Sequence, residues 1–344
     1  MKRRLPAEWE PQDAVLIAWP HPESDWAPTL EEVEPVFLEL AKAITHYEDL
    51  IVVAPEAERL RRLFRGAGID LERIRIHTVP TNDTWCRDFG PITVFDSDGP
   101  HLLDFGFNGW GLKFAADHDN RVNRRLHAGG VFGATPLEIE DLILEGGSIE
   151  SDGRGTLLTT SRCLLEANRN PALDARDIER TLRQKLGADR VLWLENGALQ
   201  GDDTDSHVDT LARFCPDDTI AYVRCDTPDD PHYAELKAME NELRAFRDAS
   251  GAPYRLLPLP WPPPCFDDEG HRLPATYANF LVINKAVLVP TYGSRQDDHA
   301  LQAIEQAFPD RDIIGIDCLP LIRQHGSLHC VTMQIPRGVV TCAR

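Results

Sequence analysis

The sequence predicts an α/β fold in which repeated strand–helix–strand units form one closed assembly. Two observations predict it. Short apolar, strand-like stretches alternate with amphipathic helical stretches along all 344 residues. No long linker or low-complexity tract divides them. We therefore expect a single domain over residues 1–344, with polar residues at the strand ends converging on an axis.

The first units are the clearest. Ala14–Trp19 is apolar and reads as a buried strand, and Leu30–Tyr47 has apolar residues at three- and four-residue spacing, which is typical of a helix. The β-branched Leu50–Ala54 predicts a strand. Pro55–Phe64 predicts a helix, with proline in its first turn and glycines just past its end. Ile74–Val79 is the next strand.

The same rhythm recurs further along the chain. Three more helices each lead to a strand: Asp174–Leu186 to Val191–Leu194, Tyr233–Ser250 to Tyr254–Leu257, and Asp297–Phe308 to Ile313–Ile316. Two hairpins are predicted between them: Ile92–Phe95 with Leu102–Phe105, and Phe280–Ile283 with Val287–Val289. The proline-rich Pro258–Pro264 predicts a surface loop inside the repeat.

Composition excludes several classes of protein. The formal charge of −20, from 36 basic and 56 acidic residues, disfavours nucleic acid as a partner. No apolar run approaches the ~18 residues of a membrane span, and the N-terminus has no signal-peptide pattern. The eight cysteines lack CxxC or zinc-ligand spacing, so we expect a cytoplasmic protein with mostly reduced thiols: Cys86, Cys163, Cys215, Cys225, Cys265, Cys318, Cys330 and Cys342.

One cysteine lies in a setting that suits a nucleophile. A glycine-containing turn at His325–Ser327 leads into Leu328–Met333, which we predict to be a short strand with Cys330 inside it. A sheet would fix the direction of that thiol. A cysteine in a strand is usually a small core residue, so the assignment depends on the rest of the chain.

Four other stretches place reactive residues on tight turns. They are Asn82–Pro91, Asn108–Gly111, Leu144–Ser148 and Gly201–Asp209. Taken singly, each has an ordinary structural explanation: an ion pair, a hairpin turn, a solvated acidic loop or metal cradle, or a hydrogen-bonded histidine.

Together these stretches fit one reaction. A planar guanidinium is best held by carboxylates in forked geometry. His207 and Asp209 alternate on a predicted strand, so both should point to one face. A histidine there can act first as an acid and then as a base in a covalent reaction. A bound cation beside the cysteine would also stabilise the thiolate.

The chain resembles the agmatine deiminase and bacterial Porphyromonas-type peptidyl-arginine deiminase family, within the guanidino-group-modifying enzymes. Five separated signatures carry the resemblance from Pro6 to Gln334, in the order typical of the family. The resemblance implies a fivefold pseudosymmetric α/β propeller, the pentein fold, with the active site on its axis.

The resemblance also implies roles for single residues. Cys330 looks like the nucleophile and His207 like the general acid/base. Asp88 and Asp209 resemble the pair that grips the guanidinium, and Glu145 resembles the carboxylate that completes the pocket. Four further residues are implied around the substrate: Trp85 as an aromatic wall, and Trp110 with Asp203 or Asp205 at the far end, where a primary amine would sit.

The implied reaction is hydrolytic deimination. The Cys330 thiolate attacks the guanidinium carbon, His207 protonates the departing ammonia, and water activated by His207 releases a ureido product. No metal or organic cofactor is required, and the partner is a small cationic guanidino substrate. A homodimer is kept open as an assembly.

Agmatine, giving N-carbamoylputrescine, is the leading substrate, and the acidic Asp202–Asp205 loop favours it because a carboxylate suits an amine. Free arginine or a C-terminal peptidyl arginine is the alternative. An amidinotransferase and a non-catalytic binding module are further alternatives. The sequence departs from the family at His325–Leu328, which has one glycine in place of a glycine-rich run, and at Ser206 and Cys86.

Overall fold

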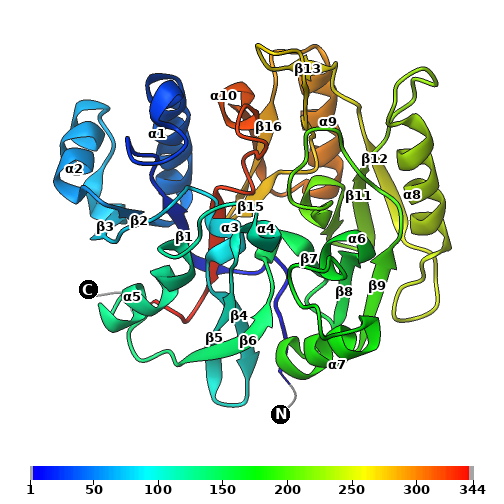
Figure 1. The fold of residues 1–344 in the computed structure, drawn as a ribbon, viewed down its shortest axis with the longest axis horizontal. Helices are drawn as coiled ribbons and strands as arrows, with labels where there is room; N and C mark the ends of the chain where they lie inside the picture. The colour runs from blue at the N-terminus through cyan, green and yellow to red at the C-terminus, as the bar shows by residue number, and fades with distance from the viewer. Residues whose placement is uncertain (1–2, 341–344) are drawn as a thin grey trace.

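The protein is a mixed α/β assembly of small sheets. The structure, a computed structural model, describes residues 3–340, which form five sheets of three or four strands and one two-stranded hairpin. The longer helices lie toward the outside of the strands (Figure 1). The α/β class predicted from the sequence is therefore confirmed.

The first sheet joins distant parts of the chain. Its strand order is β18 (Thr332–Pro336), β1 (Gln12–Ala18), β2 (Asp49–Ala54) and β3 (Ile74–Thr78). β18 is antiparallel to β1, and the other two pairings are parallel. The strand that follows Cys330 is therefore fixed by a strand from the opposite end of the sequence.

The other four sheets share one pattern, in which an antiparallel pair is followed by a parallel neighbour. They are β4 (Ile92–Asp96), β5 (Gly99–Gly106) and β6 (Leu137–Ile143); β7 (Ile149–Ser151), β8 (Thr156–Thr160) and β9 (Arg190–Leu194); β10 (Ala212–Cys215), β11 (Thr219–Val223) and β12 (Arg255–Leu259); and β15 (Leu281–Ile283), β16 (Ala286–Thr291) and β17 (Asp312–Asp317). Both predicted hairpins are confirmed, at β4–β5 and β15–β16. The hairpins β7–β8 and β10–β11 were not predicted.

Five longer helices cross between parallel strands. They are α1 (Leu30–Tyr47), α2 (Ala57–Gly66), α7 (Ala175–Leu186), α8 (Tyr233–Ala245) and α9 (Gln296–Ala307). α7 illustrates how capping residues set the two ends of such a helix. Asp174 caps its first turn in a capping box, and Gly187 ends it with a φ of 74°. Shorter helices occupy the connections: α4 (Gly109–Leu112), α5 (Val122–Ala128), α6 (Ser161–Leu164) and α10 (Leu319–Ile322).

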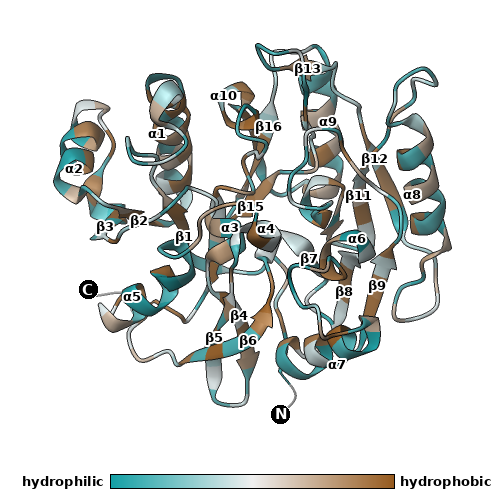
Figure 2. Ribbon diagram, viewed as in Figure 1, coloured by the Kyte–Doolittle hydropathy of each residue, from teal (hydrophilic) through white to brown (hydrophobic). Residues whose placement is uncertain are grey.

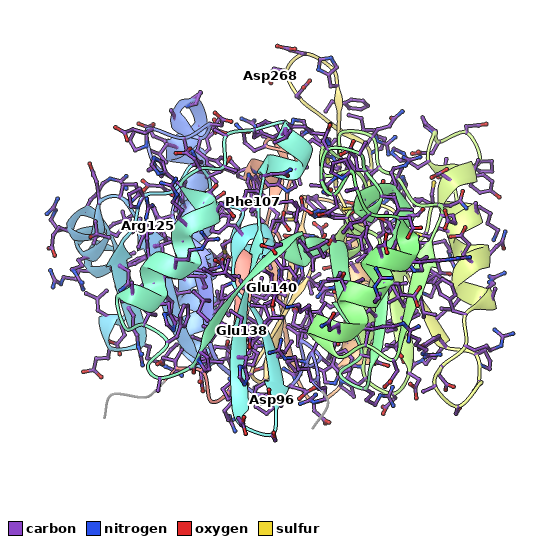
Figure 3. All side chains as sticks on the ribbon, turned by 60° about the horizontal axis from the view of Figure 1, so that its bottom comes forward. Asp96, Phe107, Arg125, Glu138, Glu140 and Asp268 are labelled. Carbon is purple, nitrogen blue, oxygen red and sulfur yellow. The ribbon has the colours of Figure 1, made fainter. Side chains whose placement is uncertain are left out.

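Two local predictions were wrong. The helix predicted to reach Ser250 ends at Ala245, because the Asp248 carboxylate accepts the backbone N–H groups of Ser250 and Ala252 and closes a turn instead. The predicted proline-rich surface loop begins inside strand β12, which runs to Leu259. The loop then carries a small hairpin, β13 (Cys265–Phe266) with β14 (Arg272–Leu273), and Asp268 lies at its protruding tip (Figure 3).

Apolar residues gather on the strands, and hydrophilic residues colour much of the outer helices (Figure 2). Within residues 3–340 all seven cysteines are free thiols and six are buried, as expected for small core residues. Cys342 lies outside the described residues. Over this range no helix has both the length and the apolar stretch needed to cross a bilayer.

Candidate active site

Five turns supply the polar residues of the site. Each turn comes before an edge strand that pairs antiparallel with its neighbour: β4, β7, β10, β15 or β18. Three of the turns are helical: α3 (Cys86–Phe89), η4 (Gly146–Ser148) and η5 (Val208–Thr210). α3 packs against η4, and η4 packs against η5. In chain order the turns contribute Asp88, Glu145, His207 with Asp209, Asn279 and Cys330.

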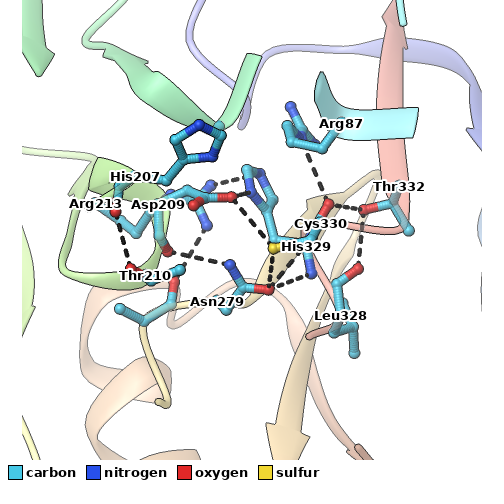
Figure 4. Close-up of polar contacts among 12 residues, drawn as sticks. Arg87, His207, Asp209, Thr210, Arg213, Asn279, Leu328, His329, Cys330 and Thr332 are labelled. Carbon is cyan, nitrogen blue, oxygen red and sulfur yellow. Dashed lines mark hydrogen bonds and ion pairs between the residues drawn. The ribbon is translucent and has the colours of Figure 1, made fainter. Parts of the chain in front are cut away.

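Cys330 lies in a turn rather than in the predicted strand, which begins only at Thr332. Asn279 explains this, because its side-chain oxygen accepts the backbone N–H of His329 at 2.9 Å and lies 3.3 Å from the N–H of Cys330. These groups are thus unavailable to a strand ladder. The same oxygen lies 3.4 Å from Cys330 Sγ (Figure 4). Cys330 itself is only 6% exposed.

His207 and Asp209 also lie outside a strand, which corrects the second strand prediction. His207 precedes the short 3₁₀ helix η5, and Asp209 is inside it. They nevertheless converge, with Gly147 as their shared neighbour. A Cβ atom placed on Gly147 would lie 2.7 Å from His207 Nδ1, 2.8 Å from Asp88 Oδ1 and 3.1 Å from Asp209 Oδ2.

Asp88 and Trp110 were both predicted to be in the pocket, and the structure brings them together. The Trp110 indole N–H donates to Asp88 Oδ2 at 2.9 Å, and the Gly147 N–H donates to Oδ1 at 3.0 Å. His207 Nδ1 lies 3.6 Å from Oδ1. Trp110 has a φ of 54°, which is uncommon outside glycine and directs its ring onto the carboxylate.

Glu145 is held by an arginine that sequence reasoning missed. Arg169 Nε donates to both carboxylate oxygens, at 2.9 and 3.0 Å, and both side chains are fully buried. Arg169 also donates to Asp205 at 2.7 Å, and Lys113 Nζ lies 2.8 Å from the same oxygen. Two protein cations therefore already pair with Asp205, so Asp205 is less suited than Asp203 to bind a substrate amine.

A cavity of about 320 Å³ leads to the thiol. Trp85 and Gly326 line one part of it in close contact, since a Cβ on Gly326 would lie 2.1 Å from the Trp85 ring. The lining residues are Asp25, Asp83, Trp85, Asp88, Trp110, Phe114, Asp203, Thr204, Gln324, His325, Gly326 and Cys330. Trp85, Trp110 and Asp203 are thus among the lining residues, although Trp110 lies against Asp88 rather than at the far end. Asp25, Asp83 and His325 also line the cavity and were not predicted.

The buried carboxylates make further negative charge unfavourable in the site. Burial raises the pKa of the Cys330 thiol well above its usual range, and Asp209 and Asp88 raise it further. Burial likewise raises the pKa of Asp88, with Asp209 and Glu145 adding to the effect. Burial lowers the pKa of His207 to about 3, so the imidazole is neutral. A bound cation would reverse the penalty on both the thiolate and the Asp88 carboxylate.

Two groups of potential metal ligands lie among the described residues. One is Glu145, Cys163 and His207, and the other is Glu8, Glu150 and His329. In each group a guanidinium, from Arg169 or Arg213, already pairs with the carboxylates. A divalent cation would have to displace that charge, so neither group is suited to a metal.

Residues 4–336 match the model of the Porphyromonas-type peptidyl-arginine deiminase family. The chain belongs to this family. A structure from Porphyromonas gingivalis, provisionally assigned as an arginine deiminase, is 52% identical, with a TM-score of 0.94 over 99% of this chain and 100% of that one.

Two family relatives are agmatine deiminases. The C. jejuni enzyme, solved as a cysteine-to-serine variant with substrate bound, is 38% identical, with a TM-score of 0.91 over 98% of this chain and 97% of that one. The agmatine deiminase of Pseudomonas aeruginosa is 33% identical over 97% of this chain and 95% of its own length.

Asn279 could have been found from the sequence, because it comes shortly before an apolar strand, as the other site residues do. Arg169 had no comparable signal. Its partners Glu145 and Asp205 lie 24 and 36 residues away, and only the fold brings them together.

Proposed function

We propose that the protein hydrolyses the guanidino group of agmatine, releasing ammonia and N-carbamoylputrescine. One observation carries the proposal: Cys330 and Asp88 line one cavity, Asp209 lies 3.9 Å from the Cys330 sulfur, and the neutral His207 meets Asp88 and Asp209 around Gly147. Family membership and the relatedness to agmatine deiminases support the same reaction.

Binding comes first. Asp88 and Asp209 take the guanidinium N–H groups, and Glu145 completes the acidic surround. Asp209 Oδ1 has no hydrogen-bond partner within residues 3–340, so it is free to accept a substrate N–H. The substrate charge favours ionised Asp88 and the Cys330 thiolate, because it offsets the repulsion described above.

In the first chemical step His207 takes the thiol proton, and the Cys330 sulfur attacks the guanidinium carbon. The protonated His207 then gives its proton to one amino group, the C–N bond breaks, and ammonia leaves. A positively charged thiouronium remains on the sulfur. Both ring nitrogens of His207 lack partners within the described part of the chain, so the ring is available for these transfers.

In the second step His207 takes a proton from water, and the hydroxide attacks the same carbon. The C–S bond breaks, the ureido product leaves, and the sulfur regains a proton. One proton is left over, and ammonia carries it away as ammonium. No step involves a metal or organic cofactor.

The lining of the cavity favours agmatine. Asp25, Asp83 and Asp203 are among its lining residues, and carboxylates suit a primary amine. Free or peptidyl arginine is the second candidate. His325 and Gln324 line the same cavity and could donate to a carboxylate, and the 52% identical relative is provisionally an arginine deiminase.

We also propose that the five sheets form a fivefold pseudosymmetric propeller, the pentein fold, as one domain over residues 1–344. The shared pairing pattern and the β1–β18 closure support this. The free cysteines suit a cytoplasmic setting, and the charge of −20 disfavours nucleic acid partners.

The test is ammonia release from agmatine, arginine and an arginine-terminated peptide, measured in parallel. We expect the highest kcat/KM with agmatine, no turnover by Cys330→Ala, and severe loss in Asp209→Asn. Full activity in Cys330→Ala would reject covalent catalysis. A preference for the peptide or for arginine would reject agmatine as the substrate.

A further inference from the structure

His329, which directly precedes the nucleophile, is buried between two carboxylates. Its Nδ1 lies 2.8 Å from Asp209 Oδ2 (Figure 4), and its Nε2 lies 2.7 Å from Glu8 Oε2. Burial alone would raise the pKa of Asp209, but the hydrogen bond from His329 lowers it. The pKa of Glu8 is lowered too, because Arg213 and His329 outweigh its burial. Both carboxylates are therefore ionised and can only accept hydrogen bonds.

The ring must then carry two protons. An unprotonated Nε2 would place its lone pair against a Glu8 oxygen at 2.7 Å. Arg213 Nη2 also lies 3.1 Å from Nε2, but it donates to Glu8 at 2.8 Å. His329 is thus an imidazolium that donates in both directions.

Glu8 is itself held in place. Its Oε1 accepts the Val282 N–H at 2.7 Å, and its Oε2 accepts from Arg213. Arg213 is anchored in turn by Glu150 and by the Phe280 carbonyl, and is almost fully buried. The hydrogen bonds from Glu8 through His329 to Asp209, called the link below, therefore start from a carboxylate that is held in place.

The link also determines which oxygen of Asp209 remains free. Oδ2 is bound to His329, whereas Oδ1 has no partner in the described part of the chain, and the residue is fully buried. Leaving a buried carboxylate oxygen unpaired is costly, which suggests a ligand partner. A rotation of the carboxylate would break the bond to the imidazolium.

We propose that Glu8 and His329 are positioning residues that hold the Asp209 carboxylate in the orientation in which it receives the substrate guanidinium. This rests on the proposed function, in which Asp209 binds the guanidinium. Neither residue touches the reacting atoms. Glu8 acts from a segment more than 300 residues before the nucleophile in sequence, since its contact to His329 spans 321 residues.

Graded variants test the link. Glu8→Gln and His329→Asn each leave a neutral donor to Asp209, so each should lower kcat/KM about tenfold, mainly through KM. His329→Leu leaves no donor, and a loss of about 100-fold is expected. Glu240→Gln is the matched control, because Glu240 is also a buried carboxylate paired with an arginine, but its partners are Tyr222, Lys237 and Arg244. It should stay within about threefold of the wild type.

A double-mutant cycle separates positioning from general damage. If both residues act through one link, Glu8→Gln with His329→Asn should be no worse than either alone, whereas Glu240→Gln with His329→Asn should be additive. NMR of ¹⁵N-histidine-labelled protein should show two protonated ring nitrogens for His329, and one in Glu8→Gln. If thermal unfolding shows that Glu8→Gln is not folded, the kinetics of His329→Asn and the wild-type NMR spectrum still test the proposal.

Equal losses in Glu8→Gln and Glu240→Gln, or a neutral His329 ring in the wild type, would overturn the proposal. Failure of the proposed function would give a different experimental result. The wild type would then release no ammonia from any guanidino compound, whatever the protonation of the ring.

Discussion

Gly147 provides a direct test of the site geometry. In Gly147→Ala the new methyl carbon would lie 2.7 Å from His207 Nδ1 and 2.8 Å from Asp88 Oδ1, closer than the 3.0 Å below which real Cβ contacts essentially never occur. Both side chains must move by several tenths of an ångström. Since a misplacement of about 1 Å can cost 10²-fold, and two reacting groups move, we expect kcat/KM to fall roughly 10²- to 10⁴-fold.

The fold should survive this change, because overpacking by one methyl group costs about 1–3 kcal/mol. The assay is ammonia release from agmatine, with thermal unfolding to confirm a folded variant. Gly66→Ala is the control, because a Cβ on Gly66 meets nothing within 4 Å. A folded Gly147→Ala with kcat/KM within about threefold of wild type, no more than a neutral surface change would give, would refute the geometry.

Three further predictions follow from the cavity. Agmatine binding to a variant lacking the nucleophilic sulfur should release protons, because the raised pKa of Asp88 falls when a cation pairs with it; calorimetry in buffers of different ionisation enthalpy checks this, and zero release contradicts it. The KM for agmatine should rise as pH falls through 6, because burial raises the pKa of both Asp83 and Asp203 to about 6 and protonation removes their charge; a flat KM between pH 7 and 5 would argue against an amine subsite. Gly326→Ala should raise KM, because the new carbon collides with the Trp85 ring; unchanged kinetics would place that ring outside the substrate path.

Local patterns predicted much of the fold. The helix Leu30–Tyr47 was predicted with its bounds, because its apolar spacing continues through Pro35 and its inner face is buried. The short hairpins β7–β8 and β10–β11 were missed. Their strands have only three to five residues, too few for alternation to show.

The predicted site residues do converge, but by a different local geometry. Cys330 and Asp209 were predicted to lie in strands, yet both lie in turns held by distant partners such as Asn279 and His329. Such pairings join residues 51 and 120 positions apart. No periodicity along the sequence encodes them.

The pairing of β1 with β18 sets the time at which the protein can become active. Gln12 faces Pro336 across that pair, so the turn bearing the sulfur gains its support only after residue 336 has left the ribosome. Contacts this distant in sequence form slowly. A nascent chain should therefore have formed most of its sheets well before it can catalyse the reaction.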